Sequence, residues 1–190
     1  MKNLFLLTAL IFFCTSGLAH KPVLSEDLEF SAKSPYIIEE PETSKAIFSN
    51  LNGSDHFYKI DSDRDFDFYA AVLAPKIDEC PQQHVFSFEV LDADFHTILI
   101  ADGESYEWWP WYEKYGGQWY WSGPEIGENF ASNRIFKAGT YYIKVFNQNN
   151  QGRYILAVGD VEKFSISDFF GLFFTMGDIE KQFWGSKVCE

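Results

Sequence analysis

Residues 140–147, TYYIKVFN, and residues 152–158, GRYILAV, decide the fold class of this chain. Both runs are rich in the aromatic and β-branched residues that strands favour. In the first run Tyr141, Ile143 and Val145 fall on alternate positions, as on one face of a half-buried strand. The polar residues 148–151 lie between the runs and fit the loop of a β-hairpin. We therefore predict a pair of antiparallel strands here.

Earlier runs along the chain show the same period-two pattern. Turn signals such as Asn52-Gly53-Ser54 and Asp102-Gly103 separate them. The runs cover residues 46–51, 56–61, 65–73, 85–91 and 95–101. Short strands at regular spacing, with no helical pattern between them, are typical of a sandwich or barrel. We predict an all-β fold, an antiparallel and jelly-roll-like β-sandwich.

Residues 165–183 depart from this pattern and predict a C-terminal helix. Six apolar residues have helical spacing, namely Phe169, Leu172, Phe173, Met176, Ile179 and Phe183. Ser165 with Asp168 resembles a capping box. We expect the helix to pack on the sandwich. The alternative is an anchor in a membrane interface, which the shortage of basic residues disfavours.

The N-terminus has the pattern of a secretory signal peptide. Lys2 precedes a short apolar run, and Gly17-Leu18-Ala19 places small residues at a cleavage site. We predict export, to the periplasm or outside the cell, with no transmembrane segment in the mature chain. The predicted divisions are a signal peptide at 1–19, an extended lead-in at 20–44, a sandwich domain at 45–160 with an aromatic insert at 104–124, and a helical segment at 161–190.

Cleavage after Ala19 leaves two cysteines, Cys80 and Cys189. An oxidising compartment favours the pairing of two such thiols. We predict a Cys80–Cys189 disulfide that ties the C-terminus to a loop. Two free thiols are the alternative, because sequence alone does not give the distance between them.

The net charge of the chain argues against some classes of binding partner. It has 15 Lys and Arg against 28 Asp and Glu, a formal net charge of −13. Such a balance argues against nucleic acid and anionic membranes, which need clustered basic residues. Four acids, Asp61, Asp63, Asp65 and Asp67, alternate along one run. They lack the glycine and glutamate of an EF-hand loop. A calcium site at a strand edge is the one cofactor that this run leaves open, beside the simpler interpretation as solvent-facing acids.

Residues 106–121, YEWWPWYEKYGGQWYW, are the most unusual feature of the sequence. Pro110 and Gly116-Gly117 interrupt the segment, which predicts a loop or two short strands around a turn. Tryptophan and tyrosine are favoured where one edge of a ring stays in water. We take as candidate ligand-binding residues Tyr106, Trp108, Trp109, Trp111, Tyr112, Trp119, Trp121, Glu107 and Glu113.

This cluster permits three interpretations. Rings can stack on the C–H faces of a polysaccharide while carboxylates accept hydroxyl protons. They equally suit a protein partner, because tryptophan and tyrosine dominate interface hot spots. The third interpretation is a small local core with no ligand.

Two stretches carry a resemblance to a known family. Residues 138–145, AGTYYIKV, and 152–158, GRYILAV, resemble the closing hairpin of bacterial pre-peptidase C-terminal-like domains. Residues 55–60, DHFYKI, are similar to an earlier strand of that family. The resemblance implies a secreted β-sandwich that serves exported enzymes as a non-catalytic binding or accessory module. The aromatic insert departs from the family pattern.

Catalysis has little support in the sequence. It contains no GxSxG elbow, no HExxH and no P-loop. We predict no catalytic residues, and we hold a glycan-cleaving enzyme as the weakest alternative. The leading hypothesis is an exported accessory module that binds carbohydrate through its aromatic segment. The rival is a structural or protein-interaction protein of the cell envelope.

Overall fold

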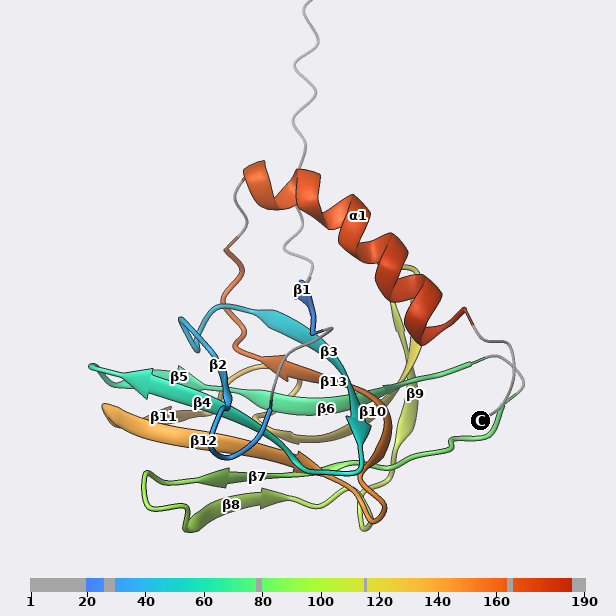
Figure 1. The fold of residues 1–190 in the computed structure, drawn as a ribbon. Helices are drawn as coiled ribbons and strands as arrows, with labels where there is room; N and C mark the ends of the chain where they lie inside the picture. The colour runs from blue at the N-terminus through green and yellow to red at the C-terminus, as the bar shows by residue number, and fades with distance from the viewer. Residues whose placement is uncertain (1–19, 26–29, 78–79, 115, 164–165, 186–190) are drawn as a thin grey trace, which may run out of the picture.

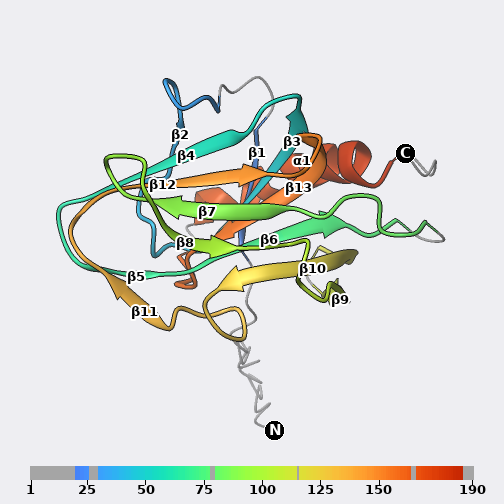
Figure 2. The ribbon, with the colours of Figure 1, turned by 90° about the horizontal axis from the view of Figure 1, so that it is seen from below.

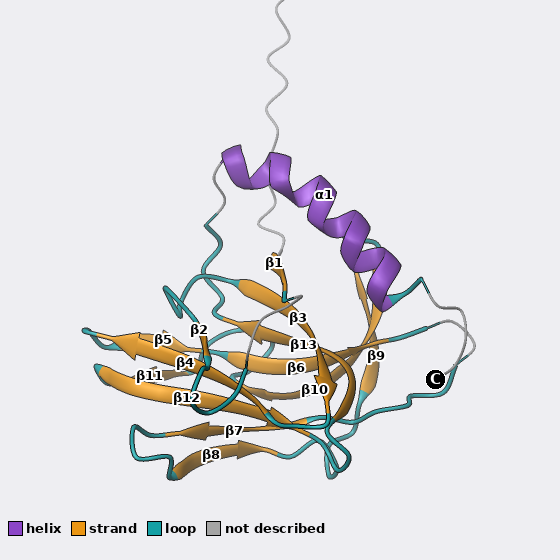
Figure 3. Ribbon diagram, viewed as in Figure 1, coloured by secondary structure: helices purple, strands orange, loops and turns teal. Residues whose placement is uncertain are grey.

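The computed structural model describes residues 20–25, 30–77, 80–114, 116–163 and 166–185, and gives the backbone alone for residues 166–174. Two β-sheets pack face to face, and one helix crosses the outer face of the larger sheet (Figure 1). Strands make up most of the regular structure (Figure 3). The predicted all-β sandwich with a C-terminal helix is confirmed.

The larger sheet has six strands in the order β1-β3-β13-β6-β10-β9. Its strands are β1 Lys21–Leu24, β3 Lys45–Asn52, β6 Ala70–Pro75, β9 Trp109–Glu113, β10 Gln118–Ile126 and β13 Gln151–Val158. All its pairs are antiparallel except β1 with β3.

The smaller sheet has five strands in the order β2-β4-β12-β7-β8. Its strands are β2 Tyr36–Ile37, β4 His56–Ser62, β7 Ser87–Leu91, β8 Thr97–Ala101 and β12 Gly139–Phe146. A separate pair joins β5 Phe66–Phe68 to β11 Arg134–Phe136, and the helix α1 spans Ile166–Phe183.

The predicted strands are present, with three differences. The run 65–73 is divided, because Tyr69 separates β5 from β6. The lead-in 20–44 contributes β1, which pairs in parallel with β3, and β2, which pairs in parallel with β4. Both sheets are therefore mixed rather than purely antiparallel. Their prolines and polar residues hid them from the pattern. β11 was also not predicted, since three residues are too short to show a period.

β13 is covered on both of its faces. Tyr154, Leu156 and Val158 belong to the core between the two sheets. Ile155 and Ala157 belong to a second core, which Ile179 and Phe183 of α1 complete. This explains why the run GRYILAV is almost continuously apolar, as expected for a strand with no solvent-facing side.

A chain of hydrogen bonds crosses the core between the sheets. Nδ1 of His56 on β4 lies 2.8 Å from the Tyr154 hydroxyl on β13 and 3.2 Å from the Ser49 hydroxyl on β3. The Tyr154 and Tyr58 hydroxyl oxygens are 2.6 Å apart. Burial lowers the pKa of His56 to about 4. The imidazole is therefore neutral in the folded chain near neutral pH, and the network fixes both sheets without a buried charge.

The last turns of α1 pack against the larger sheet, as predicted. Ile179 and Phe183 are buried, and the Phe183 ring meets Phe48 edge-on at 5.1 Å between centroids. The predicted cap at Ser165 and Asp168 lies outside the described residues. No helix in the described ranges has the length and apolar character needed to cross a membrane.

We predict that protonation of His56 makes folding stability depend on pH. The folded chain has a pKa of about 4 for this group, against 6.5 for an unperturbed imidazole, so the unfolded chain binds the proton more readily. The contribution of the neutral His56 imidazole to the free energy of unfolding is complete above about pH 6.5 and is lost as the pH falls toward 4. Between pH 7 and pH 5 the wild type should lose about 1–2 kcal/mol more unfolding free energy than His56→Asn. Urea unfolding at both pH values measures the difference.

The matched control is His96→Asn, which removes an exposed imidazole. It should keep the pH dependence of the wild type. An equal loss in His56→Asn and the wild type would show that this imidazole does not control the pH dependence.

Candidate ligand-binding site

The aromatic segment forms a β-hairpin at the edge of the larger sheet. β9 pairs with β10 in antiparallel register, from Gln118 opposite Glu113 to Ser122 opposite Trp109. Gly117, at a φ of +68°, supplies the left-handed residue of the turn. The Glu113 carboxylate accepts the Gly116 N–H, and the Glu113 carbonyl accepts the Gly117 N–H at 3.0 Å. The predicted pair of short strands around Gly116-Gly117 is therefore present.

Strand pairing divides the rings between two faces. Residues directly opposite each other in a sheet share a face, and neighbours along a strand alternate. Trp111 lies opposite Tyr120, whereas Tyr112 lies opposite Trp119. The first pair faces α1, and the second pair faces the other way.

The face toward α1 is a local core. Its rings are Trp109, Trp111, Tyr120, Phe130 and Trp184. Trp111 and Phe130 are 5.2 Å apart between centroids, and Tyr120 meets Trp184 at 5.1 Å. Burial raises the pKa of the Tyr120 hydroxyl, with Glu113 adding to the shift. On this face the local-core interpretation describes the packing.

The opposite face carries what we call the aromatic shelf, formed by Tyr112, Trp119 and Trp121 with Lys76. The Tyr112 and Trp119 side chains are 43% and 42% exposed, and their ring centroids are 5.1 Å apart. The Lys76 ammonium lies 5.9 Å from the Trp119 ring and 5.7 Å from the Trp121 ring. The planes of the Tyr112 and Trp119 rings are tilted by 48° to each other, and Lys76 lies at cation–π distance from the tryptophans.

The other predicted site residues lie outside the shelf. Trp108 packs against the core between the sheets, and its Nε1 donates to the Gly103 carbonyl at 2.9 Å. Glu113 faces its own turn. Tyr106 and Glu107 are exposed in the segment before β9. Of the nine predicted residues, the structure therefore brings together three rings on the shelf, and sequence reasoning missed Lys76.

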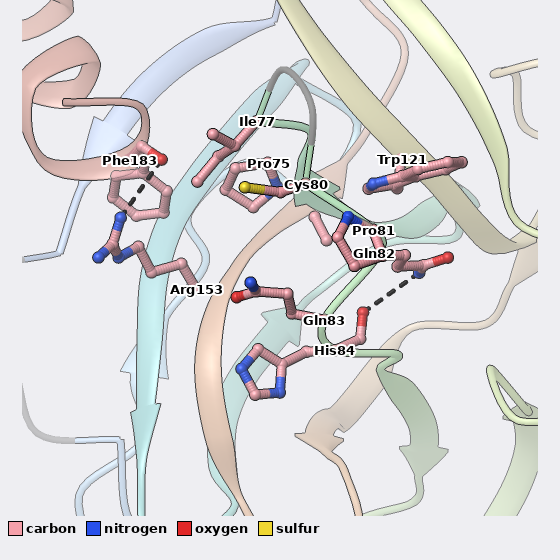
Figure 4. Close-up of a pocket in the computed structure, with 11 residues that line it drawn as sticks. Pro75, Ile77, Cys80, Pro81, Gln82, Gln83, His84, Trp121, Arg153 and Phe183 are labelled. Atoms are coloured by element: carbon pink, nitrogen blue, oxygen red, sulfur yellow. Dashed lines mark hydrogen bonds between the residues drawn. The ribbon is translucent and has the colours of Figure 1, made fainter. Parts of the chain in front are cut away.

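A small hollow of about 50 Å³ adjoins the shelf at Trp121. The loop between β6 and β7 forms one wall with Gln82, Gln83 and His84 (Figure 4). Gln82 Nε2 donates to the His84 carbonyl at 3.2 Å, and Arg153 Nη1 donates to the Phe183 carbonyl at 3.4 Å. The hollow therefore places amide groups in the same lining as the partly buried Trp121 ring, with Arg153 beside Phe183. The sequence singled out Cys80 in this loop but not Gln82, Gln83 or His84, since these side chains come near Trp121 only through the fold.

The alternating acids of residues 61–67 act as structural partners of neighbouring strands. The Asp61 carboxylate accepts a hydrogen bond from the Thr140 hydroxyl at 2.5 Å and forms an ion pair with Lys59 at 2.6 Å. Asp65 accepts Lys137 Nζ at 2.7 Å, and this hydrogen bond lowers the pKa of its carboxyl. These contacts match the simpler interpretation of the run.

A different acidic group lies in the turn before β8. In the described part of the chain, Asp92, Asp94 and His96 are the one set of three such side chains with ligand atoms within 4.8 Å of one another. Asp92 Oδ1 accepts the N–H groups of Asp94 and His96 at 2.9 Å each. The turn therefore uses the Asp92 carboxylate for its own backbone.

Comparison with known proteins adds no relative. No protein-family model matches the chain, and no curated protein is similar to it in sequence. The resemblance to pre-peptidase C-terminal-like domains therefore stays an expectation.

We predict that the hollow lies beside a disulfide between Cys80 and Cys189. Cys80 and Phe183 line the same hollow, and Cys189 follows Phe183 by six residues, which reach about 20 Å when extended. Cys189 lies outside the described residues. Non-reducing peptide mapping of residues 20–190 should find the two cysteine peptides linked. Cys80→Ser should lower the unfolding free energy by about 3–5 kcal/mol. Two alkylated thiols in the native protein would contradict the pairing.

We also predict that Trp108 is a structural anchor. A Cβ added at Gly123 would lie 2.4 Å from the Trp108 ring and 2.6 Å from the Val72 carbonyl oxygen. Gly123→Ala should therefore destabilise the fold by about 1–3 kcal/mol in urea unfolding. The control is Gly177→Ala, where nothing lies within 4 Å of the added atom. That change should be neutral or stabilising by up to about 1 kcal/mol, because alanine favours a helix. Equal changes in unfolding free energy for Gly123→Ala and Gly177→Ala would contradict the structural role of Trp108.

Proposed function

We propose that this chain is an exported, non-catalytic accessory module that binds polysaccharide on the aromatic shelf. The observation that carries the proposal is the pair of exposed rings, Tyr112 and Trp119, whose centroids lie 5.1 Å apart on the β9–β10 hairpin. Apolar ring faces left in water favour a ligand with an apolar face of its own. The C–H face of a sugar ring supplies one.

The two faces of the hairpin support the distinction between packing and binding. On the face toward α1, Phe130 and Trp184 cover the rings of Trp111 and Tyr120. On the shelf, the Lys76 ammonium lies near the rings of Trp119 and Trp121. A local core alone accounts for the first face and leaves the second unexplained.

Polar groups beside the shelf suit the hydroxyls of a sugar. Lys76 offers N–H donors, and the Gln82 and Gln83 amides offer donors and acceptors at the hollow. The chain has a formal net charge of −13, which repels anionic polymers at long range. These features favour a neutral polysaccharide.

The exported, accessory character rests on sequence. Residues 1–19 carry the signal pattern, and the pre-peptidase C-terminal-like resemblance implies a module that accompanies an exported enzyme. The absence of a recognisable nucleophile or metal motif in the sequence agrees with a binding role.

We predict that Trp119→Ala weakens binding of the mature chain, residues 20–190, to insoluble polysaccharide. The probes are cellulose, chitin and xylan, and retention is measured as a depletion isotherm on each. Loss of one stacking ring should weaken the isotherm at least about tenfold on the polysaccharide that binds. Trp119→Phe should restore most of the binding, because a ring face returns.

The matched control is Trp109→Ala. Trp109 is 38% exposed, close to Trp119, but belongs to the opposite face of the hairpin. It should bind as the wild type does. Equal losses in both variants, or no retention of the wild type on any of the three polymers, would contradict the proposal and favour a protein partner on the shelf.

A further inference from the structure

The strand β8 has an open edge, interrupted by one β-bulge. It ends the smaller sheet, with β7 on one side and no partner strand on the other within the described residues. An edge strand exposes a row of N–H and C=O groups, and proteins commonly protect such edges with proline or by shortening them.

The other sheet edges in the described part of the chain carry those protections. β1 contains Pro22, and β9 contains Pro110. β2 has two residues, and β5 and β11 have three each. β8 has five residues and no proline. A bulge opposite Val90 and Leu91 is its one irregularity, and Leu99–Ala101 keep regular register.

The side chains of β8 are apolar after Thr97, and two isoleucines on one face are exposed. Ile100 is 59% exposed and Ile98 is 43% exposed. Leu99 points the other way and packs, partly buried, against the core between the sheets. A strand added at this edge would therefore cover isoleucines on one face and extend the core on the other.

The two sheets of the sandwich differ in size. The larger sheet has six strands and the smaller has five. Seen from below, β10 and β9 lie beyond β8, on the side away from β7 (Figure 2). An added strand would face the inner surface of β10, where the Trp108 ring packs on Gly123.

Charge restricts what fits there. Asp92 and Asp94 precede β8, and Asp102 and Glu104 follow it, all on the surface of the flanking turns. Apolar residues thus lie between two acidic ends. A second copy of this chain would bring the same acids into proximity and would add a net charge of −13 to another of −13.

We propose that the β8 edge takes an extended peptide strand from a partner protein, apolar in its centre and basic at its ends. Main-chain hydrogen bonds to the edge supply affinity, and the alternating side chains supply specificity. This surface lies next to the aromatic shelf, since Trp119 and Trp121 are on the same inner face of β10, but pairing with β8 does not depend on carbohydrate binding.

The test uses residues 20–190 and a fluorescent peptide of alternating valine and threonine with two lysines at each end. Fluorescence anisotropy should show saturable binding. The same peptide with N-methyl groups on alternate residues keeps its side chains and charge but loses its edge hydrogen bonds. It should bind at least about tenfold more weakly. Replacing the lysines by glutamates should also weaken binding.

The protein variant is Ile98→Thr/Ile100→Thr, which removes the apolar side chains from the edge without adding charge. It should weaken binding at least about tenfold. The control pair is Ile37→Thr/Ile135→Thr, which changes two exposed isoleucines on other strands, at 50% and 66% exposure. It should bind as the wild type does.

Three results would overturn the proposal. Equal binding of the N-methylated peptide would show that no edge pairing occurs. Equal losses in the two double variants would show that the surface is not β8. Sedimentation velocity that finds a dimer, dissolved by Ile98→Thr/Ile100→Thr, would assign the edge to a second copy instead.

Discussion

The double coverage of β13 is the constraint on which the rest of the structure depends. This strand has apolar side chains on both faces, and neither face can be left in water without a large cost in free energy. One face requires the smaller sheet, and the other requires α1. The chain therefore needs its C-terminal helix to complete a second core, even though the sandwich is already formed without it. The network through Tyr154 then fixes the relative position of the two sheets.

The same helix determines how the aromatic hairpin divides its rings. α1 ends beside β10, and Trp184 directly after it donates its Nε1 to the Trp119 carbonyl at 3.1 Å. This contact supports the hairpin from the face toward α1 and covers Tyr120. No equivalent element among the described residues covers Tyr112 and Trp119, because the smaller sheet ends at β8. The exposure of the shelf thus follows from the difference in size between the sheets.

Sequence patterns predicted the elements that are long enough to show a repeating pattern of apolar residues. The strands at 140–147 and 152–158 and the helix over 165–183 agree with the structure within a few residues. The patterns did not predict which side chains are buried where burial depends on segments far away in the sequence. Alternation shows that Trp111 and Tyr112 point apart, but only the register with β10 and the place of α1 tell which ring is buried. Lys76 joins the shelf because it directly follows β6, which pairs with β10, a neighbour far along the chain.

The acidic character of the chain also has a structural explanation that composition could not give. Asp61 and Glu89 each pair with a lysine on the same or a neighbouring strand, and Asp65 before β5 pairs with Lys137 after β11, so part of the negative charge is matched by nearby lysines. The shelf and the hollow, by contrast, bring Lys76 and Arg153 close to rings and amides. A strongly acidic protein thus keeps one surface where cationic groups and exposed aromatic rings meet. The net charge of the chain is an average over the whole surface and does not describe the surface at the shelf and the hollow.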